Sequence, residues 1–285
     1  MRKPSRSQHP SSGSSTRPSP TPSKNFYNGS STATLFSGGV ANLASDSSFD
    51  LAANAETQGL KQYGNHKNIR LIYIITEVSY RLVARADAGI AQLSDRTAAL
   101  SISSPHLSFS HNHSFPPDRQ KPTPNAVPVR GKKKIGTISG TSAAVFIQRL
   151  LATAGISPDA YTTVSANVCM ATPCAANTFP SLLAANIIDA FGVWEPSVEL
   201  GIRAVGQDGV VVFQNGSLYR EVYSLYTTTE KLADAQKRAD IVAFVRALNQ
   251  TRDVFTNPTP ALYSFVADAI GMDEEVVKAV WSEHK

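Results

Sequence analysis

Residues 134–154 read KIGTISGTSAAVFIQRLLATA, and this stretch decides the fold class. Its first part, 134–138, has the short apolar pattern of a strand, and the polar turn 139–142 follows. Apolar residues then recur at helical spacing up to Gly155, a typical residue to end a helix. A strand, a turn and an amphipathic helix in this order predict one unit of an α/β fold.

The same alternation continues on both sides of this stretch. The segment 69–75 (IRLIYII) is the clearest strand of the chain, because it is near-continuously apolar and β-branched like a strand buried on both faces. Residues 229–285 read as helices. The remaining expected strands are 49–53, 80–84, 161–166, 187–194 and 210–213, and the remaining expected helices are 57–63, 179–186 and 197–205. This alternation predicts parallel sheets with covering helices, arranged as two α/β lobes.

Two stretches do not fit a packed domain. Residues 1–24 contain eight Ser and five Pro but no Leu, Ile, Val or aromatic residue, so we expect a disordered tail over 1–34. The segment 96–128 is rich in Pro, Ser and His, and we expect a disordered insertion over 95–131. The folded part then divides into lobe one (35–94, partial), lobe two (132–212), and a return segment with C-terminal helices (213–285).

Charge and hydropathy argue against a nucleic-acid partner and against a membrane-spanning helix. The formal net charge is +5, but the tail 1–24 carries five basic residues and 96–128 a net +2, which leaves −2 on the rest of the chain. We therefore expect no nucleic-acid partner, because binding to a duplex needs a basic folded face. No run of 18 apolar residues exists, so we expect no membrane span, and the tail lacks the apolar segment of a signal peptide.

Three loops follow expected strands and therefore lie where open α/β sheets bind ligands. The candidate residues in these loops are Asn54, Glu56, Thr57, Thr76, Glu77, Ser139, Gly140, Thr141 and Ser142. Around 139–142, free backbone N–H groups and the helix dipole favour an anion, although an ordinary helix cap has the same pattern. Glu56 and Glu77 would disfavour a dianion and would suit a zwitterion or a neutral heteroaromatic ring.

Longer segments carry a resemblance to a known family. The segments 132–156, 177–201, 49–90 and 246–280 together resemble the SsuA-like solute-binding proteins of ABC transporters, which bind sulfonates, taurine, nitrate or thiamine pyrimidines. The motifs IDAFGVWEP (188–196) and KIGTISGTS (134–142) are moderately specific in combination. The resemblance implies a two-lobed type II periplasmic-binding-protein fold with an interlobe cleft. It also implies Trp194 and Glu195 as further ligand contacts, with a buried core Trp and a solvated Glu as the alternative.

The chain departs from that family's pattern. The family normally opens with a strand, a loop that touches the ligand and a long helix. Here the Ser/Pro-rich tail stands in their place, so we expect lobe one to be incomplete. A retained intron or an incorrect gene model would explain both the tail and the insertion. Family members normally work in the periplasm or outside the cytoplasm, where Cys169 and Cys174 could form a disulfide; inside the cytosol they would stay free thiols.

The sequence therefore predicts a monomeric binding protein without a cofactor or metal, which holds a small molecule and, by family analogy, works with a membrane transporter. Two alternatives stay open. A thiamine-pyrimidine synthase-like enzyme would need the CCCFC segment of those synthases, and the matching region SLYREVYSLY (217–226) has no cysteine. The other alternative is a truncated relic that binds nothing.

Overall fold

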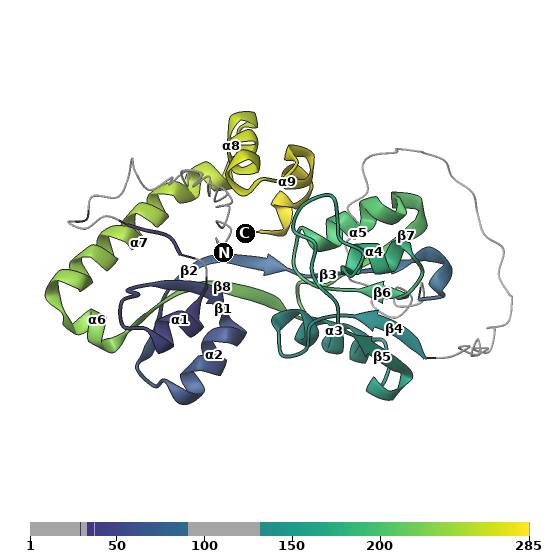
Figure 1. Cartoon of the computed structure of the whole chain (residues 1–285), viewed down its shortest axis with the longest axis horizontal. Coiled ribbons are helices and arrows are strands. Elements are labelled where there is room, and N and C mark those ends of the chain that lie inside the picture. The colour runs from purple at the N-terminus through teal and green to yellow at the C-terminus, as the bar shows by residue number, and fades with distance from the viewer. Residues whose placement is uncertain (1–28, 30–32, 37, 91–131, 285) are drawn as a thin grey trace, which may run out of the picture.

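The structure is a computed structural model, and it describes residues 29, 33–36, 38–90 and 132–284. The expected insertion over 95–131 lies outside the described residues, as does the expected tail over 1–34 apart from Gly29, Ala33 and Thr34. The described chain is α/β, as expected, and forms two halves, each with its own sheet (Figure 1).

The helices and strands follow in this order: α1 (Val40–Ser45), β1 (Ala52–Ala55), α2 (Glu56–Asn65), β2 (Ile69–Ser79), β3 (Arg81–Arg85), β4 (Lys133–Gly136), α3 (Ser142–Thr153), β5 (Tyr161–Val164), α4 (Phe179–Ala184), β6 (Ala190–Phe191), α5 (Ser197–Val205), β7 (Val210–Gln214), β8 (Arg220–Thr228), α6 (Thr229–Ala233), α7 (Ala235–Thr256), α8 (Pro260–Ile270) and α9 (Glu274–Val280).

The sheet of lobe two is mixed, with the strand order β5-β4-β6-β3-β7. Its strand β4 pairs in parallel with β5 and β6, whereas β3 pairs antiparallel with β6 and β7. The expectation of a parallel sheet is therefore right for one side of this sheet and wrong for the other. The parallel strands are reached through helices, whereas β3 enters directly from lobe one, with only Tyr80 between β2 and β3.

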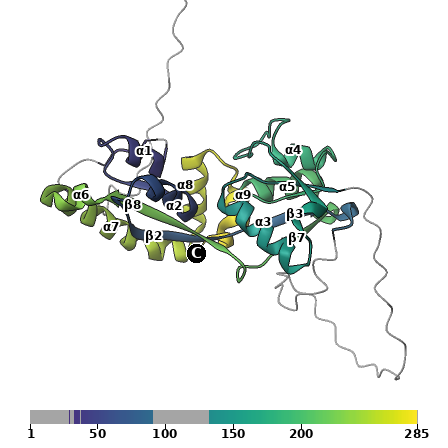
Figure 2. The ribbon, with the colours of Figure 1, turned by 90° about the horizontal axis from the view of Figure 1, so that it is seen from below.

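The lobe boundaries also differ from those expected. Strand β3, expected in lobe one (35–94), belongs to the sheet of lobe two, and β8 from the return segment is the central strand of the other sheet, β1-β8-β2. The described chain thus passes from one sheet to the other twice, from β2 to β3 through Tyr80 and from β7 to β8 through residues 215–219. Figure 2 shows β2 and β8 side by side as they leave lobe one, and Ser79 pairs with Arg220 at the end of their ladder.

The core of lobe two lies on both faces of its sheet. Helix α3 packs Phe146 and Ile147 against Leu82 on one face, and α4 and α5 pack Phe179 and other apolar residues against Val83 on the opposite face. The side chains of Leu82, Val83 and Ala84 in β3 point alternately to the two faces, and all three are fully buried because helices cover both. This explains why the middle of β3 (82–84, LVA) is apolar, with an arginine at each end of the strand.

The sheet of lobe one is less covered. Helices α1 and α2 lie at one face, where Val40, Leu43 and Ile69 pack around Tyr226, and α7 lies at the other. Strand β2 is longer than expected and is not buried on both faces, because Leu71 and Ile74 are 48% and 52% exposed. Within the described residues this sheet has three strands and β2 forms one of its edges, so neighbouring strands do not enclose these side chains.

The C-terminal helices form as expected. Helix α7 ends at Thr256, before Asn257 and Pro258, and the Thr259 hydroxyl caps α8 by accepting a hydrogen bond from the Leu262 backbone N–H. Helix α9 packs Val276 against Leu200 of lobe two, so the chain's C-terminal part contacts both halves (Figure 1). Among the described helices, none has the length and hydrophobicity needed to cross a bilayer.

Candidate functional site

The first turn of α3 lies at the junction of the two lobes. Strand β4 ends at Gly136, where a side chain would collide with Phe179 and Phe191, and the chain then turns through Gly140, whose φ of 73° suits glycine. The Thr141 hydroxyl donates a hydrogen bond to the carbonyl of Ile138 (2.6 Å) and makes no capping bond to the helix. Of the expected site residues here, Ser139 and Gly140 are exposed, and Ser142 is buried (1% exposed).

The first turn of α2 meets the first turn of α3 across this junction. The hydroxyl oxygens of Thr57 and Ser142 are 2.9 Å apart, and the Gln58 amide donates a hydrogen bond to the Gly140 carbonyl (3.4 Å). Both helices therefore direct their N-termini to the same place. Each helix N-terminus carries roughly half a positive charge, so the junction attracts negative groups.

Two carboxylates of the chain lie at this junction. Glu56 accepts hydrogen bonds from the Tyr219 hydroxyl and from the backbone N–H of Val222 (2.9 Å). Glu221, at the start of β8, accepts a hydrogen bond from the Tyr80 hydroxyl (2.5 Å) and is only 7% exposed. Both tyrosines belong to the two passages between the lobes, so the carboxylates are held where the lobes join. We call Glu56, Thr57, Tyr80, Ser142, Tyr219 and Glu221 the junction cluster.

The protonation of the junction cluster reflects its burial. Desolvation raises the pKa of Glu221, and the hydrogen bonds of Tyr80 and Ser142 offset this only in part. Nearby Glu56 raises the pKa of Glu221 further, whereas His284 lowers it. Burial also raises the pKa values of Tyr80 and Tyr219, so both phenols stay protonated at neutral pH and act as donors to the carboxylates.

Aromatic rings support the cluster from lobe two. The ring of Tyr80 is stacked with Phe146 at 5.9 Å and with Tyr219 at 6.2 Å between centroids. The guanidinium of Arg149 lies 5.8 Å from the Tyr219 ring centre, and it donates a hydrogen bond to the Leu218 carbonyl (2.9 Å). These contacts fix the positions of both phenol groups.

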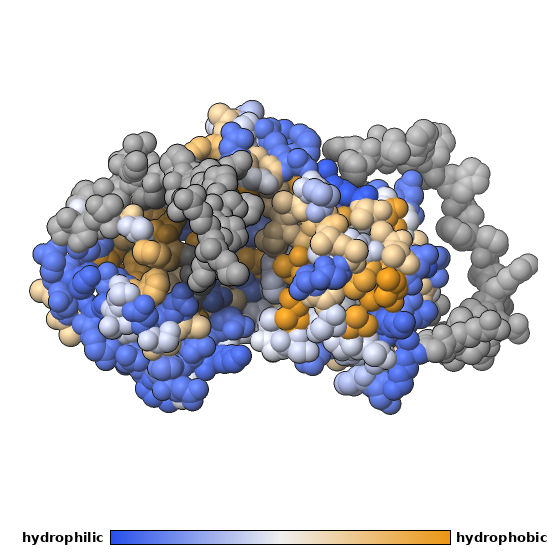
Figure 3. All heavy atoms as spheres, viewed as in Figure 1, coloured by the Kyte–Doolittle hydropathy of each residue, from blue (hydrophilic) through white to orange (hydrophobic). Residues whose placement is uncertain are grey.

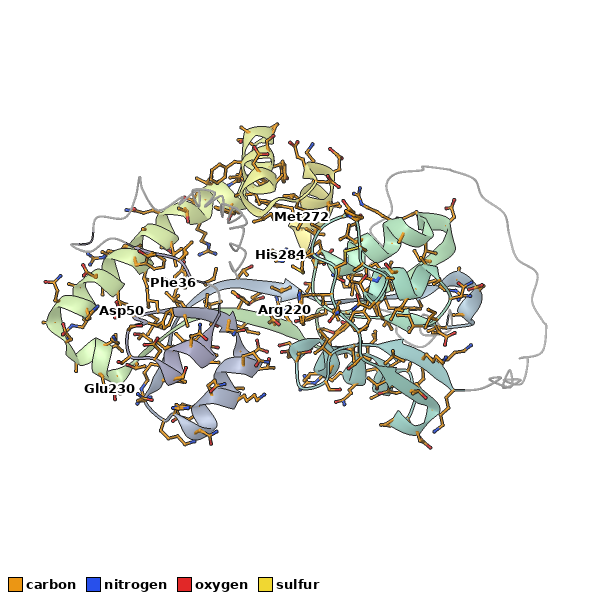
Figure 4. The ribbon with its side chains drawn as sticks, in the orientation of Figure 1. Phe36, Asp50, Arg220, Glu230, Met272 and His284 are labelled. Carbon is orange, nitrogen blue, oxygen red and sulfur yellow. A yellow bond between two sulfur atoms is a disulfide. The ribbon has the colours of Figure 1, made fainter. Side chains whose placement is uncertain are left out.

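The other expected residues of lobe one lie beside the cluster with their own partners. The Asn54 side chain accepts a hydrogen bond from the Ala55 backbone N–H (2.9 Å), and the Thr76 hydroxyl donates to the Glu77 carbonyl (3.2 Å). Glu77 forms an ion pair with Arg220 at 2.5 Å. Figure 4 shows Arg220 between the two halves of the molecule. The charge of Glu77 is therefore balanced by Arg220, whereas the sequence analysis treated Glu77 as an unpaired carboxylate that faces the ligand.

Trp194 and Glu195 belong to the interior of lobe two. The Glu195 side chain is 2% exposed and pairs with Arg81 of β3 at 2.7 Å, and it also accepts the Glu199 backbone N–H at 3.0 Å. Glu195 was expected to contact a ligand or solvent, but the structure places its carboxylate in a buried ion pair. Trp194 is half-buried and packs against both cores of lobe two.

Cys169 and Cys174 are joined by a disulfide with an S–S distance of 2.05 Å. It lies where Cys169 packs on Leu200 and Val276, on the side of lobe two that meets α9. The disulfide is therefore part of the packing of lobe two and does not belong to the junction cluster. In the part of the chain that the structure describes, no group of three or more His, Cys, Asp or Glu side chains is arranged to hold a metal ion.

The sequence reasoning missed Tyr80, Tyr219 and Glu221. A signal was present in SLYREVYSLY (217–226), which contains three tyrosines and a valine, residue types that are frequent in strands. The surface between the lobes is blue and white along the lower edge in Figure 3, which agrees with the polar character of the residues there.

Comparison with known proteins gives matches by structure alone. No protein-family profile matches the chain, and no curated protein matches its sequence. The periplasmic aliphatic sulphonate-binding protein SsuA from Escherichia coli superposes with a TM-score of 0.54 at 13% identity, over 86% of this chain and 65% of that one. The chain thus spans less than two thirds of that protein's length.

Two further structures give the same result. The ligand-binding component of an ABC-type import system from Staphylococcus aureus matches with a TM-score of 0.53 at 14% identity, over 86% of this chain and 69% of the other. The alkanesulfonate-binding protein SsuA from Xanthomonas axonopodis pv. citri, bound to MOPS, has a TM-score of 0.53 at 15% identity, over 86% and 70% of the two chains. At such identities the similarity is one of fold, and the fold is that of the periplasmic-binding proteins.

Proposed function

We propose that this chain, which has the periplasmic-binding-protein fold, is a solute-binding protein without enzymatic activity. Its ligand is a small anionic or zwitterionic nitrogen or sulfur compound of the sulfonate, taurine, nitrate or pyrimidine type, held between the lobes. The observation that carries the proposal is the meeting of two helix N-termini from different lobes, with Thr57 and Ser142 2.9 Å apart. A ligand bound there would contact both lobes at once.

The polar groups at the junction support this proposal. Backbone N–H groups of a helix N-terminus, hydroxyls and carboxylates together provide donors and acceptors within one small region. The solved structures of similar fold include sulfonate-binding proteins, which favours a ligand with a sulfonate or a related group. We further propose that Ser139, Gly140 and Ser142 contact the ligand from lobe two, and Asn54, Glu56 and Thr57 from lobe one.

A ligand screen by thermal shift tests the proposal. The panel contains taurine, ethanesulfonate, nitrate and a thiamine pyrimidine, and the purified chain should gain stability with at least one of them by mass action. The variant Ser142→Ala should lose most of that gain, because it removes a hydroxyl from the junction. A matched control is Ser264→Ala, which removes an exposed hydroxyl from α8 and should keep the gain.

Two results would contradict the proposal. A cooperative melt that no compound of the panel shifts would favour the non-binding relic. Formation of a pyrimidine from added pyridoxal phosphate would favour the synthase-like enzyme. By analogy with the ABC-importer proteins of similar fold, we also propose that the chain works as a monomer that delivers its ligand to a membrane transporter.

A further inference from the structure

The last described residues, 281–284, lie against both passages between the lobes. The Glu283 carboxylate accepts a hydrogen bond from the side-chain amide of Gln214, at the end of β7, where one passage begins. The next residue, His284, forms an isolated antiparallel bridge with Val78, near the end of β2, where the other passage begins. Figure 4 shows His284 between the two halves of the molecule. Two consecutive residues thus contact a strand end at each passage.

The charges of the same two residues act on the strands that leave the passages. Burial lowers the pKa of Arg81, the first residue of β3, but the surrounding carboxylates, Glu283 among them, raise it above its usual value. Burial raises the pKa of Glu221, the second residue of β8, and His284 is among the groups that lower it. Residues 283 and 284 therefore interact with the strands on both sides of each passage.

This segment is attached to both lobes. The Trp281 ring stacks on Phe255 of α7 with 5.8 Å between centroids, and it meets Tyr263 of α8 edge-on at 4.9 Å. The Trp281 ring N–H also donates a hydrogen bond to the Phe255 carbonyl (3.1 Å). From lobe two, the Arg203 guanidinium of α5 donates a hydrogen bond to the Glu275 carbonyl of α9 (3.0 Å). Since α7 covers the sheet of lobe one, the segment is held from both sides.

The two passages are the places where the lobes can rotate relative to each other. The described chain crosses once through Tyr80 alone and once through residues 215–219, and hinges of this kind consist of a few residues at the ends of elements. A rotation about these residues would change the angles between β2 and β3 and between β7 and β8. It would therefore pull Val78 and Gln214 away from the segment that contacts them both.

We infer that residues 281–284 form a clasp across both hinges, which restricts how far the two lobes open. Glu283 is its principal contact, because its carboxylate binds the Gln214 side chain on β7 and attracts Arg81 on β3. His284 adds the pairing with β2. The clasp acts on the lobes without any ligand, so the inference goes beyond the proposed solute-binding function.

Distance measurements between spin labels on the two lobes test the clasp. The labels are attached at Lys61→Cys in α2 and Gln148→Cys in α3, because both positions are exposed. The chain's own two cysteines, Cys169 and Cys174, are joined in a disulfide and do not react with the label. With the clasp intact, we expect one narrow distribution of distances.

The test variant carries Glu283→Ala and ends at residue 283. It loses the contacts with Gln214 and Val78 but keeps Trp281 and its aromatic partners. The ratio of open to closed lobes should rise by at least about fivefold, the change that the loss of one net hydrogen bond produces. The distance distribution should accordingly broaden toward longer distances.

Two further variants serve as controls. Glu275→Gln removes the same charge from α9, where the carboxylate pairs with Lys278 of the same helix, and it should keep the narrow distribution. Glu283→Gln, with residues 284 and 285 retained, keeps an oxygen that accepts the hydrogen bond from Gln214, so its distribution should lie closer to that of the wild type than to that of the test variant.

An unchanged distribution in the test variant overturns the inference, and so does equal broadening in Glu275→Gln. If the test variant does not fold, Gln214→Ala removes the same contact from the β7 side and leaves the clasp residues in place. Its distribution should broaden, and a narrow one overturns the inference. Because no ligand is used, a failed ligand screen would contradict the solute-binding proposal and leave the clasp intact.

Discussion

The hydroxyl oxygens of Thr57 and Ser142 lie 2.9 Å apart, although 85 positions separate the two residues in the sequence. Thr57 belongs to the first turn of α2 in lobe one and Ser142 to the first turn of α3 in lobe two. This hydrogen bond therefore reports directly on how the two lobes are placed relative to each other.

We predict an energetic coupling between Thr57 and Ser142. A double-mutant cycle with Thr57→Val and Ser142→Ala should give a coupling energy of about 0.5–1.5 kcal/mol, the usual net contribution of one hydrogen bond. Urea unfolding of the wild-type chain, both single variants and the double variant measures it. Additive effects within about 0.3 kcal/mol would show that the two hydroxyls do not interact in solution.

The stability contributed by Glu221 should depend on pH. Its pKa is raised in the folded chain, so the folded state binds a proton more tightly than the unfolded state does. This contribution to the free energy of unfolding is fully present below the unfolded pKa, about 4.3, and is lost as the pH rises through the folded value. The stability of the wild-type chain relative to Glu221→Gln should therefore fall from acidic to neutral pH. A difference that stays constant in urea unfolding over this range would contradict the burial of the carboxylate.

The ion pair between Arg81 and Glu195 is buried, with side-chain exposures of 12% and 2%. Arg81→Met should lower the free energy of unfolding by about 3–5 kcal/mol, because it leaves the Glu195 carboxylate buried without its cation. Adding Glu195→Gln to that variant should restore part of the loss. If the double variant is less stable than Arg81→Met alone, the isolated carboxylate is not the cause of the loss.

Two glycine substitutions should have opposite effects. In Gly136→Ala the new methyl group would meet Phe179 at 2.6 Å and Phe191 at 2.8 Å, so we expect a loss of about 1–3 kcal/mol from overpacking. At Gly64, within α2, a methyl group meets nothing within 4 Å, so Gly64→Ala should raise stability by about 0.4–1 kcal/mol. Thermal unfolding of both variants makes the comparison, and a stable Gly136→Ala would contradict the close packing at the end of β4.

The local pattern of the sequence predicted most elements of lobe two. The strand expected at 134–138 is β4, the helix that follows it is α3, and the helix expected at 197–205 is α5. The α/β class followed from this alternation and is confirmed. Periodicity succeeds here because the spacing of apolar residues shows which face of α3 is buried, even though that face packs against residues far away in the sequence.

The junction cluster and the lobe boundary could not be predicted in this way. Glu56 has Tyr80, Tyr219 and Glu221 as neighbours only because the chain passes from one sheet to the other twice. A local sequence pattern does not show which sheet the next strand joins. The same topology explains Glu195. Its partner Arg81 is on β3, which the sequence reasoning assigned to the other lobe, so the carboxylate was expected to contact a ligand or, as the alternative, solvent.

The position of β8 has a consequence for the way the protein acquires its shape during synthesis. This strand lies between β1 and β2, and it leaves the ribosome only after the whole of lobe two has been made. Until then β1 and β2 have no shared neighbour to pair with, and the exposed apolar residues of β2, such as Leu71 and Ile74, lack even the partial cover that the finished sheet provides. The half of the molecule that begins first is therefore the half that is completed last, and nascent chains that stop before residue 220 should expose this strand to aggregation or to chaperones.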